Sequence, residues 1–155
     1  MMTDMRSQRG TGPRELLAAF HQAMVNLSAD ELADLHAEDA VYEFPLLTPG
    51  RPERYRNQAE IRQGFGAAWA AAPVRVEEIR SVVVHETTDP EVIVAEQQAF
   101  ATITGTSRSF TLPFLLVMRV RDGRIVHVRD YADALRGAFE LGRLAVVVDS
   151  LTASR

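Results

Sequence analysis

The sequence predicts one α+β domain, in which helices pack on one face of a curved antiparallel sheet. Two observations lead to this prediction. Apolar residues recur at three- and four-residue spacing up to Pro73, and at every second residue after it. A run of helices followed by a run of strands is typical of α+β folds. The length of 155 residues, of which 46% are hydrophobic, is enough for one domain with its own core.

Three helices are expected before the main run of strands. The first, residues 13–27, opens at a proline and carries its apolar side chains on one stripe. The second, residues 28–39, starts with a capping box formed by Ser28 and Glu31. The third, residues 57–73, begins at an asparagine N-cap and ends at a proline.

The strands are predicted from alternation and from turn residues. A short β-rich run at residues 40–45 precedes a loop rich in proline and glycine. Four longer runs follow the third helix, at residues 74–86, 91–103, 109–120 and 124–132. The segments "TTDPE", "TGTSR" and "RDG" between them have the composition of turns. A short closing helix is expected at residues 133–144.

The domain is expected to span residues 13–149. Residues 1–12 are polar, lack the apolar stretch of a signal peptide and are predicted to be a disordered lead-in, and residues 150–155 are predicted to be frayed. No stretch approaches the roughly 18 apolar residues of a membrane span. Together with the absence of cysteine, this favours a cytoplasmic protein.

Composition also narrows the partners and cofactors. The net charge of -4 argues against nucleic acid as a partner, and no segment suggests membrane binding. The chain has no lysine for a Schiff base and no glycine-rich phosphate loop, so no cofactor is expected. Its four histidines lack the spacing of metal ligands, so no metal is expected either. One of them, His36, precedes the segment "AEDA", which is predicted to be a turn, and is expected to be exposed.

Three segments resemble a known family: "LHAEDAVYEFP", "PGRPERYRNQAEIRQGF" and "VRDGRIVHVRDYADALR". They are similar to the SnoaL-like branch of the nuclear-transport-factor-two-like superfamily, which includes polyketide cyclases, ketosteroid isomerase relatives and limonene epoxide hydrolases. The resemblance extends from about residue 13 to about residue 144. It implies a cone-shaped, cystatin-like α+β roll, with the three N-terminal helices on the concave face of the sheet and a deep apolar pocket between them.

Asp130 is the main catalytic candidate. Strand alternation places it on one face with Val126 and Val128, which is the face expected to meet the core. The resemblance implies that an aspartate in this "RDY.D"-like segment points into the pocket and acts as an acid or base. Burial would raise its pKa toward the range useful for proton transfer. The alternative is a structural aspartate that caps the closing helix or pairs with an arginine.

The catalytic groups of two relatives are missing from this chain. Phe44 and Phe20 stand where the resemblance to ketosteroid isomerase would require the general base and the oxyanion-binding tyrosine, and Leu116 replaces the second acid. Gln97 and Ala99 stand where limonene-type hydrolases carry an arginine and a second aspartate. SnoaL-like cyclases and phenazine-biosynthesis A/B proteins are the better comparison, because these cyclases need mainly one acidic residue on the last strand.

Four further polar side chains are candidates for the pocket. Gln97 could orient a water or a substrate carbonyl, or bond to neighbouring backbone. Glu43 is either a second pocket carboxylate or a rim residue, and at most one of Glu43 and Tyr42 should point inward. His85 could be a second acid or base. His21 flanks the apolar stripe of the first helix and could reach the pocket mouth, or be an edge histidine.

The predicted pocket lining is apolar and would suit a flat, small apolar or aromatic molecule. The residues expected to line it are Phe20, Phe44, Phe65, Trp69, Ala99, Phe114, Leu116, Met118 and Val128. The alternative is that the same side chains simply fill a core. On the opposite sheet face the residues are of mixed polarity, and the resemblance implies a homodimer formed through that face.

These observations lead to three functional hypotheses. The first is a small-molecule enzyme in which Asp130 performs proton transfer during cyclisation or isomerisation of a polyketide-like carbonyl compound. The second is an activity like that of epoxide hydrolases with an incomplete triad. The third is a non-catalytic module that binds a hydrophobic ligand or a protein partner.

Overall fold

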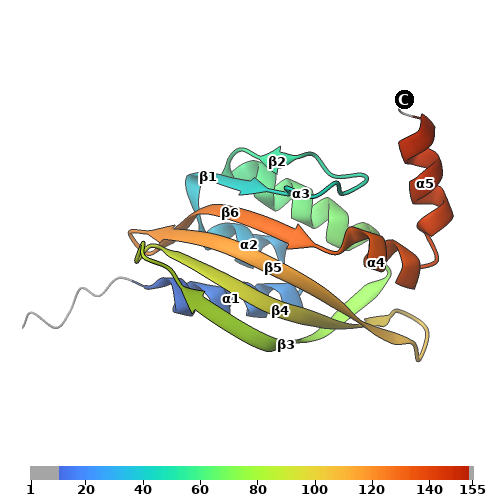
Figure 1. Ribbon diagram of the computed structural model, residues 1–155, viewed down its shortest axis with the longest axis horizontal. Coiled ribbons are helices and arrows are strands. Elements are labelled where there is room, and N and C mark those ends of the chain that lie inside the picture. Colours follow the sequence, from blue (N-terminus) through green and yellow to red (C-terminus); the bar gives the residue numbers. More distant parts are fainter. Residues whose placement is uncertain (1–10, 154–155) are drawn as a thin grey trace, which may run out of the picture.

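The computed structural model describes residues 11–153. It is an α+β fold built on one curved sheet with helices packed against it, as predicted (Figure 1). The helices are α1 (Pro13–Val25), α2 (Ala29–Asp34), α3 (Gln58–Ala71), α4 (Ala134–Glu140) and α5 (Leu144–Ala153). The strands are β1 (His36–Glu43), β2 (Arg54–Tyr55), β3 (Val74–Glu86), β4 (Val92–Ile103), β5 (Ser109–Arg121) and β6 (Arg124–Ala132). The predicted lead-in lies, up to residue 10, outside the described residues.

The sheet has the strand order β2-β1-β6-β5-β4-β3. Strands β3 to β6 form the predicted antiparallel meander. The expectation of a wholly antiparallel sheet was wrong, because β1 pairs with β6 in parallel. Tight turns force neighbouring strands to run antiparallel, but β1 and β6 are joined by most of the chain, so no turn fixes their relative direction. The sheet is therefore mixed, and β1 brings its side chains beside those of β6.

The helix starts follow the capping signals in the sequence. The side chain of Ser28 accepts a hydrogen bond from the backbone N–H of Glu31 at 3.1 Å, and that of Asn57 accepts one from Glu60 at 2.9 Å. Such caps satisfy N–H groups that have no partner within a helix. The prediction that the second helix reaches residue 39 was wrong, since α2 ends at Asp34 and β1 begins two residues later.

His36 corrects another expectation, because it is fully buried at the start of β1 instead of exposed in a turn. Its Nδ1 lies 2.8 Å from the carbonyl oxygen of Leu32. Burial lowers the pKa of His36 from 6.5 to about 4, and the hydrogen bond to Leu32 opposes this shift. The ring is therefore neutral at physiological pH, with Nδ1–H as the donor.

Two further local differences have identifiable causes. The register between β5 and β6 shifts at Val126, so that Ile125 is fully buried and Val126 is not. A bulge of this kind turns the strand by one residue and exchanges its faces. The predicted closing helix, α4, ends at Glu140, shortly before Gly142, which has a φ of +67° that favours glycine, and a second helix, α5, follows from Leu144. Helix α5 extends away from the sheet and continues to Ala153, beyond the point where fraying was expected (Figure 1).

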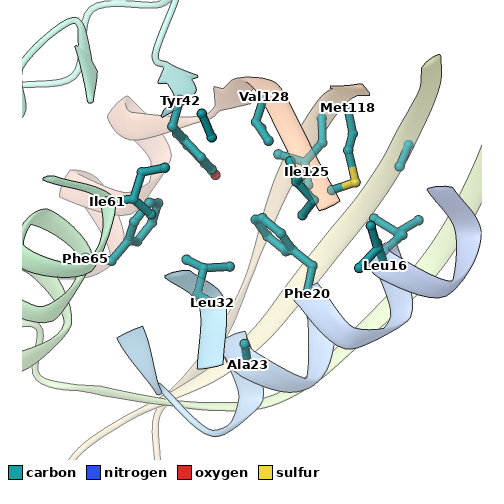
Figure 2. Packing of buried hydrophobic residues seen from close by; sticks show 14 of the residues in the cluster. Leu16, Phe20, Ala23, Leu32, Tyr42, Ile61, Phe65, Met118, Ile125 and Val128 are labelled. Carbon is teal, nitrogen blue, oxygen red and sulfur yellow. The ribbon is translucent and has the colours of Figure 1, made fainter. Parts of the chain in front are cut away.

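The core lies between the sheet and the three N-terminal helices (Figure 2). Phe20 of α1 is stacked on Tyr42 of β1 with ring centroids 6.4 Å apart, and Phe65 of α3 meets the same tyrosine edge-on at 5.0 Å. Within residues 11–153, no helix is long and apolar enough to cross a membrane.

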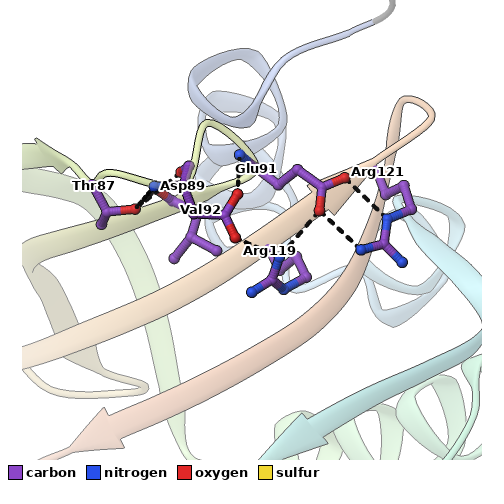
Figure 3. Close-up of polar contacts among 6 residues, drawn as sticks. All are labelled: Thr87, Asp89, Glu91, Val92, Arg119 and Arg121. Carbon is purple, nitrogen blue, oxygen red and sulfur yellow. Dashed lines mark hydrogen bonds and ion pairs between the residues drawn. The ribbon is translucent and has the colours of Figure 1, made fainter.

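A polar cluster fixes the β3–β4 turn against β5 (Figure 3). Arg119 contacts Asp89 at 2.9 Å and Glu91 at 3.1 Å, and Arg121 donates two hydrogen bonds of 2.9 Å to Glu91. Several charges in one network hold their geometry better than an isolated surface pair. This cluster stabilises an end of the sheet and contains none of the candidate site residues.

Candidate active site

Asp130 lies on β6, opposite Leu116 of β5, and faces the interior. Its Oδ2 accepts a hydrogen bond of 2.6 Å from the hydroxyl of Tyr42. Its Oδ1 is buried and has no hydrogen-bond partner among the described residues. One oxygen of the carboxyl group is thus held in place, and the other is left without a partner in residues 11–153.

The surroundings of Asp130 change its acidity. Burial raises its pKa from 3.8 to about 6, and the hydrogen bond from Tyr42 and the positive charge of Arg51 partly oppose this shift. Removing a carboxylate from water disfavours its charged form, which is the direction seen here. Asp130 is therefore largely ionised at neutral pH but is a stronger base than an exposed aspartate.

Tyr42 is fully buried on β1, where it pairs with Val128 of the parallel strand β6. Its pKa is raised well above 10, first by burial and then by the charge and hydrogen bond of Asp130. The phenol therefore stays protonated and acts as a donor. The pairing of β1 with β6 brings this donor to Asp130 across 88 positions of sequence.

Both residues line a cavity of about 290 Å³. Aromatic side chains from α1, α3 and the sheet form much of its wall, and the small residues Ala99 and Ala101 of β4 form another part. The volume lies near the lower end of the range for ligand sites, which is about 300–1,000 Å³. A molecule of one or two rings is the size that this cavity suits.

Arg51, on the loop between β1 and β2, also lines the cavity. Its guanidinium carbon lies 5.0 Å from the centre of the Phe44 ring and 5.2 Å from that of Phe65. These contacts are cation–π interactions. They hold a positive charge in the wall of a mostly apolar cavity.

Most of the predicted lining residues do reach the cavity. Those that line it are Phe20, Phe44, Phe65, Trp69, Ala99 and Phe114. Leu116, Met118 and Val128 are instead completely buried in the core, so the core-filling alternative describes them.

Gln97 and His21 form a separate polar pair. Gln97 is buried on β4, and its Oε1 lies 2.5 Å from Nε2 of His21 on α1. Burial lowers the pKa of His21, and the hydrogen bond to Gln97 opposes this shift. Neither side chain lines the cavity that contains Asp130. The structure therefore does not bring these two candidates together with the carboxyl group.

Glu43 and His85 also lie outside the cavity. Glu43 forms ion pairs with Arg54 at 3.7 Å and with His127 at 3.3 Å. Of the neighbours Tyr42 and Glu43, it is therefore Tyr42 that points inward. His85 is exposed and lies 2.7 Å from Glu96, the outward-facing neighbour of Gln97. Asp130 is thus the one carboxyl group among the residues that line the cavity.

Arg51 was not predicted from the sequence, and Tyr42 was given no role. Alternation along β1 gave a usable signal for Tyr42, since Ala40 and Tyr42 are both buried and Glu43 is not. No periodic signal marks Arg51, which belongs to an irregular loop. Among the described residues, no group of three or more histidine, aspartate or glutamate side chains could hold a metal ion.

The fold is similar to that of an NTF2-like protein from Anabaena variabilis, with a TM-score of 0.59 at 15% identity, covering 77% of this chain and 84% of that protein. Residues 17–128 match the model of the SnoaL-like domain, and the chain belongs to this family. The resemblance seen in the sequence is therefore confirmed.

Two relatives cover most of the chain. The uncharacterised protein YesE of Bacillus subtilis is 27% identical over 121 residues, which are 78% of this chain and 81% of YesE. An uncharacterised PhzA/B-like protein of Pseudomonas aeruginosa is 27% identical over 133 residues, which are 83% of this chain and 89% of that protein.

Solved structures extend the comparison. A proposed isomerase from Bacillus subtilis superposes with a TM-score of 0.75 at 26% identity, covering 84% of this chain and 92% of the isomerase. A proposed polyketide cyclase from Xanthomonas campestris has a TM-score of 0.64 at 20% identity, covering 82% and 94%. An epoxide hydrolase from M. tuberculosis that resembles limonene epoxide hydrolase has a TM-score of 0.53 at 21% identity, covering 90% and 94%. At 20% and 21% identity, the cyclase and the epoxide hydrolase show similarity to this chain in fold alone.

Proposed function

We propose that this protein is a cofactor-independent enzyme that moves a proton next to a carbonyl group of a small, polyketide-like molecule, with cyclisation or isomerisation as the result. The observation that carries the proposal is that Asp130, which lines an apolar cavity, has a buried Oδ1 with no hydrogen-bond partner among the described residues. Buried polar atoms normally have partners, so one that lacks a partner needs an explanation, and a ligand that supplies the hydrogen bond is one such explanation. The likeness to a proposed isomerase at 26% identity adds support.

In the proposed reaction, the Asp130 carboxylate accepts the proton from the carbon beside the substrate carbonyl. The electron pair of the broken C–H bond forms an enolate. In an isomerisation, Asp130 returns the proton to another carbon of the same molecule. In a cyclisation, the enolate carbon forms a bond to a second carbonyl carbon, and the proton passes to the alkoxide that results. Neither route needs an oxidant, a reductant or a cofactor.

The environment of Asp130 suits this role. A general base works best when its pKa lies near the operating pH, and burial raises the pKa of Asp130 to about 6. The Tyr42 hydroxyl binds Oδ2, which leaves Oδ1 for the substrate. We therefore assign Tyr42 as a positioning residue and Asp130 as the catalytic base.

Proton exchange into an apolar ketone tests the proposal. The protein is incubated with β-tetralone in heavy water, and deuterium incorporation beside the carbonyl is followed by NMR. Exchange should exceed the buffer rate, and Asp130→Asn should reduce the catalysed rate by about 10²–10⁴-fold. Glu43→Gln is the matched control, because Glu43 is a neighbouring carboxylate outside the cavity. A protein that binds the ketone without accelerating exchange would be a hydrophobic-ligand-binding module instead.

We also propose that the protein forms a homodimer through the outer face of the sheet. Half-buried apolar side chains on this face include Val94 and Phe100 of β4, and the guanidinium of Arg80 lies 4.3 Å from the Phe100 ring. Light scattering should give the mass of two chains, and Val94→Glu should shift it toward one. A wild-type protein with the mass of one chain would contradict this proposal.

A further inference from the structure

We propose that Arg51 binds a carboxylate of the substrate, so that the substrate class is an apolar or aromatic molecule carrying a carboxylate as well as its carbonyl group. This inference rests on the proposed function in one respect, namely that the same cavity holds the substrate. It concerns binding, and it can be tested without catalysis.

The Arg51 guanidinium lies against two aromatic rings. These are the rings of Phe44 and Phe65, and Arg51 forms part of the cavity wall. Stacking on two aromatic side chains restricts its orientation and lowers the entropy that it loses on binding a ligand. The positive charge of Arg51 therefore lies at one side of the cavity.

No carboxylate of residues 11–153 forms an ion pair with Arg51 within 4.0 Å. Among the described residues, the Arg51 side chain has no hydrogen bond and no ion pair. Arg54 in the same loop does pair, with Glu43 at 3.7 Å. A guanidinium carries five N–H donors in a planar fork that matches a carboxylate. Donors in an apolar wall are costly unless a ligand or water satisfies them.

Arg51 and Asp130 share the cavity without pairing. Both line it, and the charge of Arg51 is near enough to oppose the rise in the pKa of Asp130. The two side chains nevertheless form no ion pair within 4.0 Å among the described contacts. A substrate can therefore place its carboxylate on Arg51 and its reacting carbon at Asp130.

Binding of two matched probes tests the inference. Calorimetry at neutral pH and low salt compares β-naphthoate with β-naphthamide, which has nearly the same shape and no charge. The wild type should bind β-naphthoate about tenfold or more tightly than the amide, because charge-assisted bidentate hydrogen bonds are the strong ones. Arg51→Gln should remove this preference, and Arg51→Lys should retain part of it, since lysine keeps the charge but not the fork.

Arg54→Gln is the matched control, because it removes a charge from the same loop outside the cavity. It should leave the preference for β-naphthoate unchanged. The inference would be overturned by equal binding of the two probes, by a preference that survives in Arg51→Gln, by an equal loss in Arg54→Gln, or by no measurable binding of β-naphthoate.

The same titration on Asp130→Asn separates this inference from the proposed function. The preference for β-naphthoate should persist or increase, because a neighbouring negative charge has been removed. A protein that shows the preference but no proton exchange would retain the anion site and lose the proposed chemistry. A protein that catalyses exchange without the preference would retain the proposed chemistry and lack the anion site.

Discussion

The Tyr42 hydroxyl donates a hydrogen bond of 2.6 Å to Oδ2 of Asp130, and this contact exists because β1 and β6 lie side by side in parallel. It holds the carboxyl group in one orientation and stabilises its ionised form. The other oxygen of Asp130 is left without a partner among the described residues.

Tyr42→Phe should raise the pKa of Asp130 above its value of about 6, because the hydrogen bond from Tyr42 lowers that pKa. The rate of deuterium exchange into β-tetralone rises with pH as Asp130 ionises, and its midpoint should move upward in the variant. Tyr55→Phe is the control and should leave the midpoint in place, because it keeps the hydrogen bond from Tyr42. An unchanged midpoint with a uniformly lower rate in Tyr42→Phe would show that Tyr42 supports only the structure.

Asp130→Asn should stabilise the protein at neutral pH. Asp130 has a folded pKa of about 6 and an unfolded value near 3.8, so the folded state holds the extra proton between these values. Its contribution to stability is full below 3.8 and is lost as the pH rises through 6. Asparagine does not ionise, so the variant does not lose this stability at neutral pH, and the difference is on the order of 3 kcal/mol. Urea unfolding at neutral and acidic pH measures the difference, and a variant less stable at neutral pH would contradict the assignment.

His36 should make the protein less stable at acidic pH, whereas Asp130 makes it less stable at neutral pH. Its folded pKa of about 4 lies below the unfolded value of 6.5, so the unfolded chain binds the proton first. Stability that is present above 6.5 is therefore lost as the pH falls toward 4. In His36→Gln this loss should be smaller by ~3 kcal/mol. Asp130 contributes equally to the wild type and to His36→Gln, so its contribution cancels when their stabilities are compared over that pH range. Parallel stability curves would contradict the predicted effect of His36.

Two glycines of α3 should respond in opposite ways to alanine. The Tyr55 ring occupies the space that a Cβ at position 64 would need, so Gly64→Ala should displace that ring and cost about 1–3 kcal/mol. A Cβ on Gly66 would meet only Ala29 Cβ at 3.7 Å, so Gly66→Ala should stabilise the helix by about 0.5–1 kcal/mol. Urea midpoints measure both changes. Stabilisation by the first substitution would mean that Tyr55 does not pack against α3 as described.

The sequence was sufficient for features that depend on local spacing. Alternation identified the inward position of Asp130, and side-chain caps marked the starts of α2 and α3. It also identified most of the aromatic wall of the cavity. These features follow from residues that are close together in the chain.

Features that depend on distant segments were not predictable in the same way. The parallel pairing of β1 with β6 brings Tyr42 to Asp130, and no local pattern encodes that pairing. The burial of His36 depends on where α2 ends and β1 begins. Arg51 lies in an irregular loop, where its contacts with Phe44 and Phe65 have no periodicity to reveal them.

The ionisation of Asp130 itself is the most direct test of the account. Carbon-13 NMR of the aspartate carboxyl groups, with Asp130→Asn to assign the signal, follows this group through a pH titration. The midpoint of this titration is expected at about 6. A midpoint at or below 3.8 would mean that Asp130 is an ordinary hydrated aspartate, and it would contradict the assignment of this residue as the base of an apolar active site.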